Sequence, residues 1–148
     1  MPRPKDRSGL AAGLAIATLA SCGGLPLTAN DDAFCERAIH QPGSVEVFAW
    51  LKDPHGGRKR FGEWSTDEGL AFAHELDARG VKAMTAVGIR KFPGAEPFED
   101  ASGLVVELPD ELPKRLSVFK LYAAQVRREG YEPQADTGQK YLFLPWEK

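Results

Sequence analysis

The side chains that could carry out catalysis do not form a recognisable arrangement in this sequence of 148 residues. Asp136-Thr137-Gly138 would supply a carboxylate for proton-sharing catalysis if it followed an apolar strand, but Gln134-Ala135 precede it. We interpret the triplet as a turn before a strand. His74-Glu75 lacks a second histidine four residues after His74, because Ala78 stands there, so the helical zinc-binding pattern is incomplete.

Sites for metals and phosphates are not indicated either. His40 and His55 have no cysteine or carboxylate companions at the spacing of metal ligands, and no cofactor is expected. Gly56-Gly57 precedes a basic run, but no Lys-Ser or Lys-Thr pair completes a phosphate-binding loop. The basic run itself, Arg58-Lys59-Arg60, is either a solvated loop or a patch that meets anionic headgroups or an acidic partner. We therefore expect a protein that is not an enzyme.

The first 22 residues differ in composition from the rest of the chain. Arg3, Lys5 and Arg7 lie close to the start, and residues 9–20 carry no charge. A basic start, an apolar run of about 7–15 residues and small residues after it are typical of a secretory signal peptide. The run is too short for a membrane-spanning helix, which needs roughly 20 residues. The sequence therefore predicts export.

The segment Leu19-Ala20-Ser21-Cys22 resembles the lipobox of bacterial lipoproteins, in which a leucine and two small residues precede a cysteine. The resemblance implies that residues 1–21 are a signal peptide and that Cys22 becomes the acylated first residue of the mature protein. Each buried methylene contributes about 0.8 kcal/mol, and stable anchoring takes more than one chain. The implied location is the bacterial cell envelope, with the protein lipid-anchored and facing the periplasm or the exterior.

The charge balance counts against nucleic acid as a partner. The whole chain has 19 basic and 21 acidic residues, and residues 22–148 have 16 and 20. A mildly acidic chain has no net positive charge to attract phosphate backbones, which counts against a DNA- or RNA-binding role. Cys35 is the other cysteine. It is either a small buried residue, a thiol that pairs with another chain, or, if Cys22 carries no lipid, the partner of Cys22 in a disulfide.

Residues 22–43 are predicted to be a tether with a partly ordered end because they are rich in Gly, Pro, Ala, Asn and Asp, and residues 44–148 are predicted to be a single domain. β-branched and aromatic residues indicate strands at 44–51, 81–92, 103–108 and 140–144. A Ser65–Glu68 capping box begins a helix that ends before Gly80. A second helix follows Pro109 and ends before Gly130. Its predicted core-facing stripe consists of Leu112, Leu116, Phe119, Tyr122, Ala123 and Val126.

The resulting order, strand-helix-strand-strand-helix-strand, matches the ferredoxin-like βαββαβ sandwich. Right-handed crossovers then give an α+β fold with one antiparallel sheet and two helices on one face. The loop at 52–64 leaves room for a further short strand.

Alternation along the first and last predicted strands places four aromatic side chains on the open face of the sheet. They are Phe48, Trp50, Tyr141 and Phe143. An exposed apolar surface usually marks a contact site, unless the tether or residues 145–148 fold over it or the register differs by one residue. A base-stacking RNA platform is not expected, because the strand at 103–108 has no aromatic residue.

These observations together lead to an expected function. We expect a non-catalytic, lipid-anchored envelope protein that binds a protein partner, or a second copy of itself, through the aromatic face. The alternative is a small-ligand sensor or carrier in the periplasm, with the ligand held between the loops at 52–64 and 91–102.

Overall fold

The computed structural model describes residues 31–146. The predicted signal peptide and the lipobox at residues 19–22 lie outside the described residues. Within the described part, no helix has the length and the apolar character needed to cross a membrane. The elements in chain order are α2 (Asp32–Ile39), β1 (Val45–Glu46), α3 (Val47–Lys52), β2 (Arg58–Phe61), α4 (Thr66–Ala78), β3 (Ala83–Phe92), β4 (Phe98–Glu107), α5 (Leu112–Arg128) and β5 (Tyr141–Pro145).

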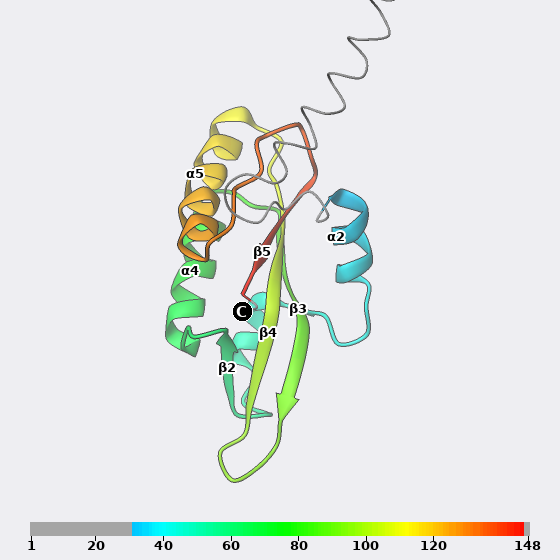
Figure 1. The fold of residues 1–148 in the computed structure, drawn as a ribbon, viewed down its shortest axis with the longest axis vertical. Helices are drawn as coiled ribbons and strands as arrows, with labels where there is room; N and C mark the ends of the chain where they lie inside the picture. The colour runs from blue at the N-terminus through cyan, green and yellow to red at the C-terminus, as the bar shows by residue number, and fades with distance from the viewer. Residues whose placement is uncertain (1–30, 147–148) are drawn as a thin grey trace, which may run out of the picture.

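The five strands form one sheet around the long antiparallel pair β3–β4. β1 pairs with β3 at one edge. The other edge of β4 is shared, because β2 runs parallel to its first half and β5 antiparallel to its second half. Helices α4 and α5 cover one face and α2 covers part of the other (Figure 1). The α+β class and the single, mainly antiparallel sheet are confirmed, whereas the ferredoxin-like order is not, because β2 and β5 lie along the same edge.

The predicted first strand, residues 44–51, is wrong for most of its length. After Val45–Glu46 the chain turns into helix α3, because the Glu46 carboxylate accepts hydrogen bonds from the backbone N–H groups of Phe48 and Ala49 at 3.1 and 2.9 Å. Such a cap satisfies amide groups that no helical carbonyl can reach, and here it overrides a composition typical of strands. The strand beside β4 is instead β2, within the loop at 52–64.

The two predicted helices are confirmed as α4 and α5. In α4 the capping box is complete, since Ser65 and Glu68 each accept a hydrogen bond from the other's backbone N–H. The predicted stripe on α5 is only partly correct, because Leu112 and Leu116 are 62% and 57% exposed. At 100° per residue, the buried side of α5 is rotated by roughly 85° from the predicted stripe. The buried residues are Val118, Tyr122, Gln125 and Val126.

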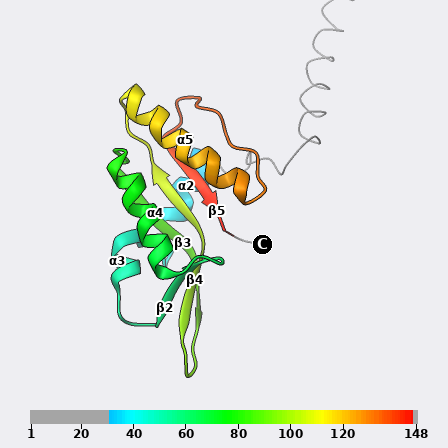
Figure 2. The ribbon, with the colours of Figure 1, turned by 90° about the vertical axis from the view of Figure 1, so that its left-hand side faces the viewer.

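The predicted tether contains helix α2, which covers the second face of the sheet (Figure 2). Its Cys35 is fully buried in a small cluster with Tyr141 and Phe143. The Phe34 ring meets the Phe143 ring edge-on, with centroids 5.2 Å apart. Burial, with the nearby carboxylate of Asp32, raises the pKa of the Cys35 thiol to about 12, as is typical of an inert buried cysteine.

The expected open face of four aromatic side chains therefore does not form. Tyr141 and Phe143 lie beneath α2, so the alternative in which the tether segment folds over this face is confirmed. Trp50 is buried in the main core on the other side, at 2% exposure. Phe48 is half-buried on α3, with its ring centroid 4.9 Å from that of the exposed His74.

Side-chain alternation along β3 and β4 is interrupted halfway, and this determines what the lower end of the sheet exposes. Before the interruption Met84 and Leu104 face the main core, whereas after it Ile89 and Ala101 do. Gly88 lies at this point with φ +62°, and a Cβ there would lie 1.8 Å from Ser102 Oγ. Only glycine adopts this conformation readily and fits the space. Beyond Gly88, the face opposite the main core consequently carries Arg90 and Phe92 on β3, and Phe98 and Asp100 on β4.

Candidate interaction face

The lower end of the sheet, beyond α2, presents a surface that we name the arginine face (Figure 1). Strand register aligns its residues in two rows across β2, β4 and β3, and residues directly opposite one another share a face. The first row is Arg60, Asp100 and Arg90, and the second is Arg58, Phe98 and Phe92.

The two phenylalanine rings of the arginine face stack on each other, and arginine guanidinium groups lie close to them. Phe92 and Phe98 lie nearly parallel, with centroids 4.5 Å apart and an interplanar angle of 15°. The Arg60 guanidinium lies over the Phe98 ring at 4.3 Å, and that of Arg90 lies 5.9 Å from the Phe92 ring. Cation–π contacts and ring stacking hold these side chains in place although Phe92 is 39% exposed.

The arginine face has one carboxylate for three guanidinium groups. Asp100 accepts hydrogen bonds from Arg90 Nη2 at 3.2 Å and from the backbone N–H of Gly62 at 3.0 Å. The exposed Arg58 side chain makes no hydrogen bond or ion pair with the described residues. Arg60 Nε is buried with no hydrogen-bond partner among them. The surface therefore keeps an excess of positive charge and unused donors.

The predicted basic patch Arg58-Lys59-Arg60 is not a single patch, because side chains alternate along β2. Lys59 points into the core, where it is 1% exposed and lies 3.5 Å from the Glu99 carboxylate. Glu99 Oε1 also accepts a hydrogen bond of 2.8 Å from Trp50 Nε1, and Lys59 Nζ donates to the carbonyl oxygen of His55. This buried network fixes β2 against β4.

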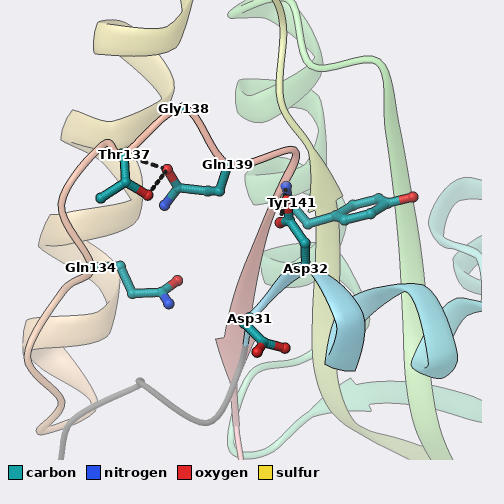
Figure 3. A pocket seen from close by; sticks show the side chains of 7 residues that line it. All are labelled: Asp31, Asp32, Gln134, Thr137, Gly138, Gln139 and Tyr141. Atoms are coloured by element: carbon teal, nitrogen blue, oxygen red, sulfur yellow. Dashed lines mark hydrogen bonds between the residues drawn. The ribbon is translucent and has the colours of Figure 1, made fainter.

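The other end of the domain has a polar hollow of about 410 Å³ between the start of α2 and residues 134–141 (Figure 3). Its acidic groups already have structural partners. Asp31 caps α2, and Asp32 accepts hydrogen bonds from the backbone N–H groups of Lys140 and Tyr141 at 2.9 and 3.0 Å. We see no carboxylate in this lining that is placed to act as a catalytic base.

The triplet Asp136-Thr137-Gly138 forms the predicted turn. The Asp136 carboxylate accepts a hydrogen bond from the Gly138 backbone N–H at 3.0 Å and lies 2.5 Å from Arg115 Nη2. The Arg115 guanidinium, followed by the Gly138 amide, holds the pKa of Asp136 below its usual value. This carboxylate tethers the turn to α5, and within residues 31–146 its hydrogen-bond partners are Arg115 and Gly138 rather than a second carboxylate.

The loops expected to hold a small ligand lie against each other. Gly57 approaches Pro97 so closely that a Cβ on Gly57 would lie 1.8 Å from the Pro97 carbonyl oxygen. The hollow beside them, of about 540 Å³, is open and lined by Gly57, Arg58, Glu96 and Pro97. Arg58 is thus shared between this hollow and the arginine face.

Comparison with protein-family models, curated proteins and solved structures found no match. In residues 31–146, no three His, Cys, Asp or Glu side chains lie close enough together to hold a metal ion. Sequence reasoning missed the two phenylalanines of the arginine face. The signal in the sequence was that charged or aromatic residues stand two positions apart in three segments, Arg58-x-Arg60, Arg90-x-Phe92 and Phe98-x-Asp100.

Proposed function

We propose that this chain is a non-catalytic, lipid-anchored envelope protein that binds an acidic protein partner through the arginine face. The observation that carries the proposal is the surplus of guanidinium groups, held beside an exposed aromatic pair, at the free end of the sheet. The order of β2, α4, β3, β4, α5 and β5 supports a ferredoxin-like plan for the domain that displays this surface.

The chemistry of the surface suits carboxylates. Guanidinium groups bind carboxylates through paired hydrogen bonds, and the exposed guanidinium of Arg58 has no ion pair within residues 31–146 to occupy its donors. The exposed ring of Phe92 adds an apolar contact of the kind found at the centre of protein interfaces. Since stacking already orders Arg60, Phe98 and Phe92, a partner would meet side chains that lose little conformational freedom on binding.

The position of the surface suits an anchored protein. Asp31, the first described residue, follows Cys22 by nine positions, and an extended chain of that length spans about 30 Å. The β3–β4 hairpin lies at the end of the domain away from Asp32, where α2 begins (Figure 1). A partner approaching from the periplasm or the exterior would therefore meet the arginine face before the anchor.

Two measurements test this proposal. The intact mass of the protein from host membranes should correspond to a chain that begins at Cys22 with added acyl groups, and a full-length unmodified chain in the soluble fraction would contradict the anchor. For the partner, a photo-crosslinking residue replaces Ala95 at the exposed hairpin turn. We expect a discrete adduct with an acidic envelope protein that weakens as salt is raised, because exposed charges are screened.

The matched variants are Arg58→Glu, which reverses an unpaired charge on the arginine face, and Arg37→Glu, which reverses an exposed charge on α2. Arg58→Glu should abolish the adduct and Arg37→Glu should leave it unchanged. An adduct that survives Arg58→Glu would show that the arginine face does not bind the partner.

A further inference from the structure

We infer that the first half of α5 rests on the membrane surface, with Leu112 and Leu116 in contact with lipid. This inference rests on the proposed anchor at Cys22 and concerns a surface separate from the arginine face. Among the described residues, the exposed large hydrophobic side chains are Phe92, Leu112 and Leu116. Phe92 belongs to the arginine face, whereas the two leucines lie on the side of α5 away from its buried residues.

Leu112 and Leu116 lie on the outward side of one helix. They are four positions apart and Lys120 follows after four more, so the three side chains form one row. In helices that lie in the interfacial region of a bilayer, leucine side chains meet the acyl boundary and lysine side chains meet the headgroups. The lysine stem can remain among apolar groups while its ammonium group reaches the headgroups.

The start of α5 lies at the same end of the molecule as the start of α2. Arg115, in the first turn of α5, donates to the carbonyl oxygen of Gln139 at 3.1 Å. The next residue, Lys140, donates its backbone N–H to Asp32 on α2 at 2.9 Å. Figures 1 and 2 show this end opposite the β3–β4 hairpin.

Chain length then brings the two leucines close to the bilayer. Because Asp31 follows Cys22 by nine positions, the start of α2 stays within about 30 Å of an anchored cysteine. An anchor on so short a segment holds the nearby surface at a high effective concentration next to lipid, so a weak contact becomes populated. Leu112 and Leu116 are the large apolar groups exposed at this end, and an exposed apolar patch of this kind commonly marks a membrane or protein contact. Docking of α5 would direct the arginine face away from the membrane.

The test uses mature protein purified from host membranes and reconstituted in vesicles of phosphatidylethanolamine and phosphatidylglycerol. An environment-sensitive fluorophore is attached at Leu116→Cys or, in a second variant, at Leu112→Cys. Cys35 is fully buried and does not compete for the label. The matched controls carry the label at Ala95→Cys on the hairpin and at Ala124→Cys, two turns further along α5 and exposed.

We expect nitroxide lipids to quench the label at positions 112 and 116 severalfold more strongly than the label at position 95, with position 124 between them. Equal quenching at positions 112, 116 and 95, in protein that floats with the vesicles, would overturn the docking of α5 while leaving the anchor intact. Protein that does not float with the vesicles would overturn the proposed anchor itself.

Discussion

Glu99 and Asp100 are neighbours on β4 with the same burial but with different cationic partners. Each residue is 8% exposed and each lies opposite a cation on an adjacent strand. The partner of Glu99 is Lys59, whose side chain is 1% exposed, whereas the partner of Asp100 is Arg90, whose side chain is 58% exposed. The two sides of one sheet segment thus place similar charges in different environments.

The exposure of the cationic partner separates charges that hold the fold from charges that remain usable for binding. A buried cation that loses its carboxylate cannot reach water, so the pair Lys59–Glu99 is a structural requirement. An exposed guanidinium that loses its carboxylate turns to solvent at little cost and can accept another carboxylate. This contrast assigns the core side of β2 and β4 to stability, and it leaves the charges of the arginine face free for the recognition that we propose.

The largest expected effect comes from disrupting the buried pair Lys59–Glu99. Glu99→Ala removes the carboxylate that faces Lys59 and that accepts the hydrogen bond of Trp50 Nε1. We expect the free energy of unfolding to fall by about 3–5 kcal/mol, because an uncompensated charge and an unpaired donor remain in the core. Urea denaturation measures this loss, with the exposed Glu96→Ala as the control. A loss as small as that of the control would mean that Lys59 reaches solvent and that the pair is not structural.

A smaller effect is expected on the exposed side. Asp100→Asn removes the charge that faces Arg90, but the new amide oxygen can still accept the hydrogen bond of the Gly62 backbone N–H. We expect a loss of about 1 kcal/mol in the free energy of unfolding. Binding to an acidic probe, poly-L-glutamate, should become tighter, because a competing carboxylate has been neutralised. Weaker binding in the variant would contradict the assignment of the arginine face to carboxylate recognition.

Local signals predicted some elements correctly and failed where two signals competed. The Ser65–Glu68 capping box and Gly80 delimit α4 because both act within one helical turn. At residues 44–51 the composition favours a strand, but the Glu46 cap favours a helix, and the structure contains mainly the helix. Asp31 caps α2 in the same way, within a segment whose Gly and Pro content indicated a tether.

The candidate site could not be predicted because it depends on contacts between distant segments. The arginine face requires β2 to pair in parallel with β4, and a polar run such as Arg58-Lys59-Arg60 does not by itself indicate a strand. It also requires the interruption of alternation at Gly88, which decides whether Phe92 and Phe98 face solvent or the core. Burial of Lys59 is set by Glu99, 40 residues later in the sequence.

The ion pair Arg115–Asp136 is of intermediate burial, with side chains 12% and 25% exposed. Its removal is expected to change the free energy of unfolding the least. The hydrogen bond from Arg115 lowers the pKa of Asp136 in the folded protein below the usual value of 3.8. The pair therefore stabilises the fold at pH values above about 4, and this contribution is lost as the pH falls through the lowered pKa. Asp136→Asn should cost no more than about 1 kcal/mol at pH 7 and less at pH 2, as measured by urea denaturation at both pH values. A cost that is equal at both pH values would show that the hydrogen bond of the turn, which the asparagine can also make to Gly138, was distorted instead.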